Sequence, residues 1–263
     1  MSCFVAHDAA YYDAKILHRD ISVGNIMISE GGGGFLIDWD MCARVGLGAQ
    51  SSGRVERTVG VCLLFQDCFV VDISLILQGT WQFMSVTLLE NNQHVHGILD
   101  DRESAFHVLT WSALRYTAHS SRDDVGPHMK PYDEAVAYRD GNVQGGSGKK
   151  NMIRDPLKVT FHPPALHELI DDLRALFDLR YPPLSVTLCD DIHCLWKAKN
   201  ARRLQQMKCR DGLVRIFREW LRSPDWLPAD MAKANALGKR AAQDTNLRPS
   251  KSQKRNDGSK GMQ

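Results

Sequence analysis

No pair of cysteines in this sequence has the C-x-x-C spacing, although the 263 residues include seven cysteines. An odd number of scattered cysteines argues against a disulfide framework and against a zinc site. The N-terminus, MSCFVAHDAAYYDAK, also lacks the basic stretch and apolar core of a secretory signal peptide. These absences predict an intracellular protein with reduced thiols, located in the nucleus or the cytoplasm.

The chain also lacks a strong net charge, because its formal charge is +2 at pH 7. We therefore expect no nucleic-acid partner. Basic residues gather in the tail after Gly238, where Lys239-Arg240 and Lys251–Arg255 resemble a bipartite nuclear-import signal for an import receptor. A solvated, disordered tail explains the same composition, and the sequence leaves both interpretations open. We assign residues 1–222 to one partial domain and residues 223–263 to a linker and this tail.

One long apolar run, Val59 to Gln78, stands between more polar segments. Asp67 and Asp72 lie inside the run, and each would cost roughly 2.5–3.5 kcal/mol near the centre of a bilayer. No basic cluster flanks the run. We therefore predict that it does not span a membrane, and we expect no membrane partner.

The same run has the features of a retained intron. Its removal joins Arg57-Thr58 directly to Gly79-Thr80 and leaves a compact loop. A valine codon begins with GT and glutamine can be encoded by CAG, and these are the two ends of an intron. We propose that residues 59–78 are a translated, in-frame intron, with a packed insertion as the alternative. Transcripts that all carry this segment would refute the intron.

Apolar spacing predicts a mainly helical fold. Residues 1–15 resemble the last turns of a helix, and periodic apolar positions predict helices over 100–118, 163–181 and 204–221. Polar composition predicts irregular structure over 121–160, including a loop at 141–151.

One small β-hairpin interrupts this helical pattern. Asn25–Ser29 and Phe35–Trp39 are short and rich in β-forming residues, and EGGGG lies between them. A phosphate-binding loop would need spaced glycines between a strand and a helix. Because the glycines here join two strands, we interpret them as the hairpin turn.

Four residues in and around the hairpin have a spacing that suits phosphoryl transfer. His18-Arg19-Asp20 is followed by four residues and then Asn25, and Asp38 ends the second strand. This is the pattern H-R-D-x4-N with a strand-end aspartate. In such a site the loop aspartate orients the acceptor hydroxyl, and the asparagine and second aspartate hold Mg²⁺. A stiff hairpin fixes the separation of these two ligands.

The quoted motifs LHRDISVGNIMI, FLIDWDMCARVG, GTWQFMSVTLL and DDRESAFHVLTW together resemble the fungal-type protein kinase domain. The resemblance covers residues 11–221. It implies the large lobe of a protein-kinase-like fold, mainly α with a small β-hairpin. It also implies Mg and ATP as cofactors and an unknown protein as the substrate.

The resemblance further implies roles for single residues. Asp20 is the catalytic base, while Asn25 and Asp38 bind Mg²⁺ with the nucleotide. Arg19 pairs with a phosphorylated activation segment, and Thr80 supports Asp20 and the substrate hydroxyl. Two residues have structural roles: His18, and Asp101, which accepts backbone N–H bonds from the loop.

This sequence departs from the family pattern at several positions. Ser22 stands where most Ser/Thr kinases have lysine, and Thr87 stands near the glutamate of the A-P-E motif, which puts the usual ion pair there in doubt. IDWD is also similar to small-molecule kinases of the aminoglycoside and choline type. Arg19 and the GTWQFMS segment argue against that group.

The groups with which a kinase small lobe holds ATP do not fit into the 17 residues before His18. We therefore expect the 263-residue chain to lack ordinary affinity for Mg·ATP and to be inactive alone. Whether it acts as an enzyme stays open. The alternative function is a non-catalytic, pseudokinase-like binding module.

Overall fold

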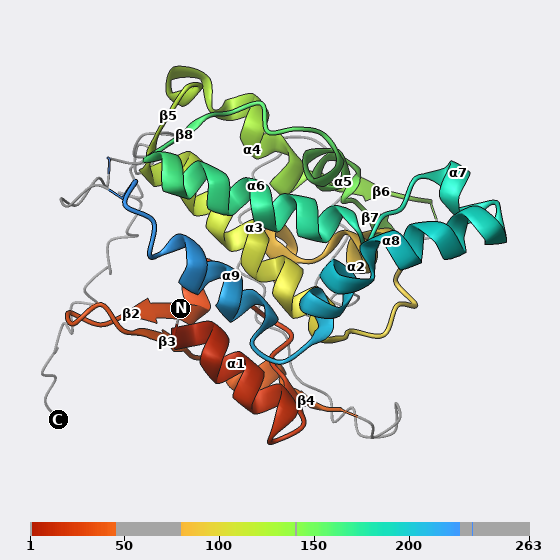
Figure 1. Cartoon of the computed structure of the whole chain (residues 1–263), viewed down its shortest axis with the longest axis horizontal. Helices are drawn as coiled ribbons and strands as arrows, with labels where there is room; N and C mark the ends of the chain where they lie inside the picture. Colours follow the sequence, from red (N-terminus) through yellow and green to blue (C-terminus); the bar gives the residue numbers. More distant parts are fainter. Residues whose placement is uncertain (1, 46–79, 140, 227–232, 234–263) are drawn as a thin grey trace, which may run out of the picture.

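Helices make up most of the structure and surround one long central helix, α3 (Figure 1). The computed structural model describes residues 2–45, 80–139, 141–226 and 233. Its helices are α1 (Ser2–Tyr12), α2 (Val86–Glu90), α3 (Ile98–Tyr116), α4 (Gly126–Asp133), α5 (Ser147–Arg154), α6 (Pro164–Asp178), α7 (Leu184–Thr187), α8 (Asp190–Lys208) and α9 (Gly212–Trp220). The mainly helical fold predicted from the sequence is confirmed.

The strands are short and form two-stranded antiparallel sheets. The pairs are β1 (Ile16–Leu17) with β4 (Ala43–Arg44), β2 (Ile26–Ile28) with β3 (Gly34–Leu36), β5 (Ala118–His119) with β8 (Phe161–His162), and β6 (Val136–Ala137) with β7 (Val143–Gln144). The predicted hairpin is therefore β2–β3. Its register places Ile26 opposite Leu36.

The glycine run forms the tight turn of this hairpin. Ser29 N–H donates to the Gly33 carbonyl at 2.8 Å, and Gly32 has φ +77°. A left-handed φ of this kind suits glycine because it has no Cβ. The interpretation of EGGGG as a turn is confirmed.

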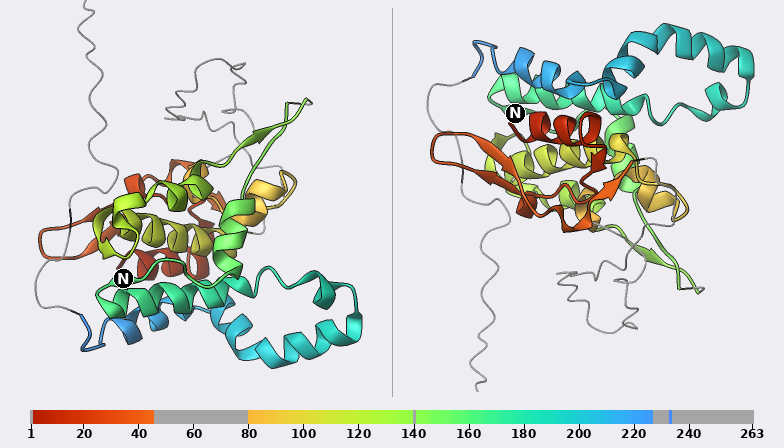
Figure 2. Two further views of the ribbon diagram at one scale, coloured as in Figure 1. Left: turned by 90° about the horizontal axis from the view of Figure 1, so that it is seen from above. Right: turned by 90° about the horizontal axis from the view of Figure 1, so that it is seen from below.

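The core forms where α6 packs on α3 and α9 (Figures 1 and 2). α6 starts at a proline, which suits the first turn of a helix. One stripe of α6 is buried and contributes Leu166, Leu169, Ile170, Leu173, Leu176 and Phe177. Burying apolar side chains of this size contributes about 1.5–3 kcal/mol each.

A second, smaller apolar cluster lies beside α1 and joins distant parts of the chain. It contains Ile21, Leu36, Phe83, Ala105 and Val108. These residues come from the loop after His18, from β3, from the turn before α2 and from α3. The cluster therefore ties together the segments that carry the predicted site residues.

Residues 121–160 are more regular than we predicted. They contain α4, the β6–β7 hairpin and α5, so the predictions of irregular structure over 121–160 and of a loop at 141–151 were wrong. α5 escaped notice because one of its buried positions is Lys149, and a lysine in a sequence indicates surface.

The predicted helix over 204–221 is two helices. α8 ends at Lys208 and α9 begins at Gly212, with Asp211 between them at φ +57°. A Cβ on Gly212 would lie 1.8 Å from the Gln206 carbonyl oxygen, so only glycine fits this close turn. Apolar spacing alone did not show the break because both helices present apolar residues to α6.

The apolar run 59–78 and the basic tail after Gly238 lie outside the described residues. Within the described parts of the chain, no helix is long and apolar enough to cross a membrane. The five cysteines that the structure describes, Cys3, Cys42, Cys189, Cys194 and Cys209, are all free thiols.

Candidate active site

Asp101 on α3 holds the backbone of the His18–Asn25 loop. Its Oδ2 accepts a hydrogen bond from His18 N–H at 3.0 Å, and its Oδ1 accepts one from Arg19 N–H at 3.1 Å. The same carboxylate bonds His7 Nε2 at 2.9 Å and His96 Nε2 at 2.7 Å. We call Asp101, these two histidines and the two backbone N–H groups the loop clamp.

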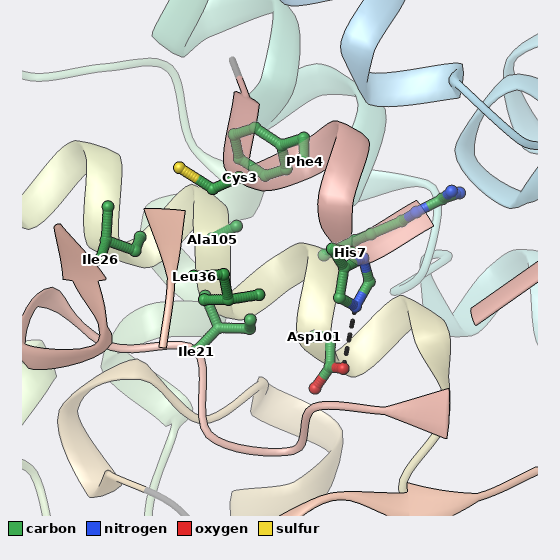
Figure 3. A pocket seen from close by; sticks show the side chains of 9 residues that line it. Cys3, Phe4, His7, Ile21, Ile26, Leu36, Asp101 and Ala105 are labelled. Atoms are coloured by element: carbon green, nitrogen blue, oxygen red, sulfur yellow. Dashed lines mark hydrogen bonds and ion pairs between the residues drawn. The ribbon is translucent and has the colours of Figure 1, made fainter. Parts of the chain in front are cut away.

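The environment keeps Asp101 ionised. Burial alone would raise the pKa of its carboxyl, but the hydrogen bonds from His7 and His96 outweigh burial and hold that pKa well below its usual range. Figure 3 shows His7, on α1, bonded to Asp101 at the edge of a small cavity that Ile21 and Leu36 also line. The clamp thus joins α1, α3 and the loop.

His18 is fully buried and has a structural position. Its Nδ1 accepts from Asp20 N–H at 3.3 Å, and its Nε2 lies 3.0 Å from the Ile37 carbonyl oxygen. Burial lowers the pKa of the imidazole. A neutral ring with its proton on Nε2 satisfies both bonds, and its edge packs against Trp39. His18 therefore links the loop to the second strand of the hairpin.

Asp20 is half-buried, and two side chains from different segments orient its carboxylate. Asn25 Nδ2 donates to Oδ2 at 3.0 Å and to the Asp20 carbonyl at 2.9 Å. Thr80 donates both its backbone N–H and its hydroxyl to Oδ1, each at 2.8 Å. The structure thus brings Asp20, Asn25 and Thr80 together across a large sequence separation.

The hairpin places Asp38 beside Asn25. Ile37 N–H donates to the Asn25 carbonyl at 2.9 Å. Asp38 is the next residue along the chain after Ile37. Asp38 has φ +60° and is exposed, and its carboxylate has no hydrogen-bond partner among the described residues. A non-glycine residue in this conformation costs about 1 kcal/mol or more. Aspartate is one of the few non-glycine residues that adopt this conformation.

The donor set suits magnesium. In the described ranges no group of three or more His, Cys, Asp or Glu could hold a metal ion. Mg²⁺ usually takes only one or two protein carboxylates and completes its shell with water and substrate phosphates. Asn25 uses its Nδ2 for Asp20, which leaves its side-chain oxygen to face a cation beside Asp38. The residues present fit Mg²⁺ held jointly with a phosphate ligand.

The Arg19 side chain does not take part in the contacts of Asp20, Asn25 and Thr80 described above. Its backbone has φ +72° and its Nε is buried without a hydrogen-bond partner in the described part of the chain. Burial lowers the pKa of its guanidinium. The segment with which we expected it to pair falls largely in residues 46–79, outside the described residues.

A second group on α3 holds the segment after Thr80, and sequence reasoning missed most of it. Arg180 bonds Asp100 Oδ1 and Glu103 Oε2, each at 2.7 Å, and Tyr181 OH donates to Glu103 at 2.7 Å. Glu103 Oε1 accepts from Val86 N–H at 2.8 Å. We call Asp100, Glu103, Arg180 and Tyr181 the segment brace.

The segment brace supplies an ion pair although Thr87 stands near the place of the usual glutamate. Thr87 occupies the place near which a glutamate was expected, and its hydroxyl lies 3.4 Å from Arg180 Nη2 and from Tyr181 OH. The acidic partners of Arg180 come from α3 instead. No spacing rule in the sequence indicated this pairing, because Arg180 lies about 80 residues after its partners.

Comparison with known proteins gives one match. The sequence model of the family described as fungal protein kinase matches residues 1–113, which include the loop, the hairpin, Thr80 and most of α3. No curated protein and no solved structure matches the chain. Residues 1–113 are therefore similar to the fungal protein kinase family, and the match supports part of such a domain in this chain.

Proposed function

We propose that the site around Asp20 transfers a phosphoryl group from a magnesium-bound nucleotide to a serine or threonine of a protein. The observation that carries this proposal is the Asp20 carboxylate, oriented by Asn25 and Thr80 beside the Asn25–Asp38 pair. In this proposal the described fold is the large lobe of a protein kinase.

The proposed chemistry follows from positioning. Phosphoryl transfer requires positioning and charge neutralisation more than covalent help from the protein, and a fixed carboxylate that orients the acceptor hydroxyl and takes its proton supplies the positioning. Asp20 is half-buried and has donors on both oxygens, which fixes its orientation. Asn25 and Asp38 would hold Mg²⁺, and a bound Mg²⁺ neutralises phosphate charge.

The metal pair is the nucleotide contact that the described residues supply. In kinases a glycine-rich turn, a lysine and a glutamate from the small lobe hold the phosphates. The 17 residues before His18 here form α1 and β1, and Ser22 stands at the position of the loop lysine. We therefore propose that the 263-residue chain alone holds Mg·ATP only through the metal pair. A micromolar dissociation constant for ATP on this chain would contradict that statement.

The same observation favours a second candidate function. A domain with an intact loop clamp and Ser22 in place of the loop lysine suits a non-catalytic binding module. A small-molecule kinase is less well supported, because Arg19 and the Thr80 segment fit the protein kinase pattern.

The metal pair can be tested without activity. Mn²⁺ is a paramagnetic stand-in for Mg²⁺, and Trp39 follows Asp38 directly. With 5-fluorotryptophan incorporated, we expect Mn²⁺ to broaden the Trp39 ¹⁹F resonance in the wild type. Asp38→Asn should weaken the broadening severalfold, while Asp40→Asn, on the exposed neighbouring position, should leave it nearly unchanged. Equal broadening in wild type and Asp38→Asn would contradict the metal site.

Phosphoryl transfer is tested at millimolar Mg·ATP with γ-labelled nucleotide and a serine-rich protein substrate. The sequence alone predicted an inactive chain, but the oriented Asp20 carboxylate leads us to expect slow transfer by the wild type at this high nucleotide concentration. We expect none by Asp20→Asn, which keeps the size of the side chain but cannot take a proton. Transfer that does not differ between the two would contradict the catalytic role and favour the binding module.

A further inference from the structure

Lys149 is a buried lysine that neither the loop clamp nor the metal pair uses. It lies on α5 with 0% of its surface exposed. Its Nζ donates to the Met84 carbonyl at 3.0 Å and to the Trp81 carbonyl at 3.1 Å. The next residue, Lys150, is partly exposed and pairs with Glu90 at 2.9 Å. Two neighbouring lysines thus have opposite environments.

The carbonyls that Lys149 holds belong to the turn that carries Thr80. Trp81–Phe83 form a single 3₁₀ turn, in which Phe83 N–H and Met84 N–H both donate to the Thr80 carbonyl, at 2.9 Å and 3.2 Å. Phe83 anchors the other side of this turn in the small apolar cluster. Thr80 then places its hydroxyl and N–H on Asp20. A short chain of hydrogen bonds therefore runs from Lys149 to Asp20.

The cost of this arrangement indicates that the ammonium has a specific task. Among the described residues, Lys149 forms no ion pair, although Glu103, Asp133 and Glu134 face it from α3 and from the end of α4. An unpaired buried charge is expensive unless hydrogen bonds satisfy it. Here two main-chain carbonyls of one turn accept hydrogen bonds from the ammonium. An apolar residue at this position would let α5 pack without the cost of burying a charge.

We propose that Lys149 is a positioning residue for Asp20, which it holds in place through the Trp81–Phe83 turn and Thr80. This inference rests on the proposed function of Asp20. Lys149 touches no reacting atom in this scheme. Its effect passes through the turn, in which the carbonyl groups point toward α5 and the Thr80 donors point toward the loop.

The hydrogen bonds from Lys149 to the turn should depend on pH through the protonation of its side chain. Burial lowers the pKa of the ammonium to about 7, against the attraction of Glu103, Asp133 and Glu134, and His107 is a further titratable neighbour. Charged donors form stronger hydrogen bonds than neutral ones. The turn should therefore loosen as the pH rises through about 7.

Global stability should change in the opposite direction. The unfolded chain keeps this lysine protonated up to its ordinary pKa, so between about 7 and 10.5 the unfolded state binds more protons and stability rises with pH. This rise follows from the burial of the lysine, whatever its role. The positioning role adds a local loosening of the turn over the same pH interval.

The test is hydrogen exchange on the full chain, followed at the Thr80 amide, which is protected by its bond to Asp20. We expect Lys149→Met to raise the exchange of this amide about tenfold, corresponding to roughly 1.4 kcal/mol of local opening. Core amides in α6 should stay within a factor of two. Lys150→Met is the matched control and should leave Thr80 exchange unchanged.

Two results would overturn the inference. One is unchanged Thr80 exchange in folded Lys149→Met. The other needs no variant: in the wild type, Thr80 exchange corrected for intrinsic rate should rise above pH 7 while the free energy of unfolding increases, and a flat Thr80 profile contradicts the role of Lys149. This second measurement serves where Lys149→Met does not fold.

The exchange result is independent of phosphoryl transfer. A wild type without any transfer would contradict the proposed function and leave the Thr80 measurement intact. Where the wild type transfers phosphate, Lys149→Met should lower kcat about tenfold with KM for Mg·ATP unchanged, since Lys149 is remote from the metal pair.

Discussion

Asp100 and Asp101 are neighbours on α3, yet they hold two different parts of the site by different means. Asp101 faces the His18–Asn25 loop and is satisfied by two histidines and two backbone N–H groups. Asp100 faces the segment after Thr80 and is satisfied by Arg180, Ser85, Gly97 N–H and His94 Nε2. The side-chain partners of Asp101 are both histidines, whereas Asp100 has one histidine and also an arginine that stays charged.

The two regions should also respond to pH in opposite ways. In the clamp, burial lowers the pKa of His7, but its bonds to Asp101 and Asp8 outweigh burial and raise that pKa above its ordinary value. Its contribution is full below about pH 6.5 and is lost as the pH rises through the raised pKa. Beside the brace, burial lowers the pKa of His107 to about 4, so acid weakens that region.

The largest expected effect breaks the brace. Arg180→Met leaves Asp100 and Glu103 buried without their cation, and breaking a buried pair in this way costs about 4 kcal/mol. Urea unfolding measures the loss. Arg203→Met removes an arginine whose pair with Asp172 is about one-third exposed, and it should cost less than about 1 kcal/mol. Equal losses in the two variants would contradict the brace.

The second prediction uses acid to separate the regions. Between pH 6.5 and about 4 the unfolded chain protonates His107 while the folded chain does not, so stability falls by about 3 kcal/mol over this interval. In His107→Phe this part of the dependence of the unfolding free energy on pH should disappear. The check is the free energy of unfolding at several pH values; parallel slopes in wild type and variant would show that His107 does not titrate this way.

A smaller effect is expected from the clamp. Asp101→Asn keeps one acceptor oxygen but loses the charge and half of the acceptor sites for His18 N–H, Arg19 N–H and the histidines. We expect a loss of about 2 kcal/mol in urea unfolding and faster amide exchange in the loop. Asp191→Asn, exposed on α8, is the control. Unchanged exchange at His18 and Arg19 would refute the clamp.

The smallest expected effect tests the hydrogen bond from Thr80 to Asp20, which connects the two regions. Thr80→Val removes one hydroxyl donor from Asp20 and should cost about 1 kcal/mol of stability. Thr80→Ser keeps the donor and should recover most of it. If valine keeps the stability and serine loses it, the methyl group of Thr80 rather than its hydroxyl carries the contact.

The sequence predicted the parts of the site that lie close together along the chain. The spacing of His18, Asp20, Asn25 and Asp38 follows from one loop and one hairpin, whose geometry short-range turn chemistry dictates. Apolar periodicity likewise predicted α3 and α6, because a helix must bury a continuous stripe. The contacts of Asp20 with Thr80 and of Asp101 with the loop were expected only through a family resemblance.

Tertiary structure alone decided the groups that cross the fold. Lys149 and Arg180 read as surface residues in the sequence, since charged side chains are rarely buried without partners. Their partners are carbonyls and carboxylates tens of residues away, brought close only when α6 packs against α3 and α5 packs against α6 and α2. By itself the sequence determined the loop and the hairpin, and it predicted the chemistry that we propose for the site. The packing of helices determined which charges hold that site in place, because burial and long-range pairing exist only in the folded chain.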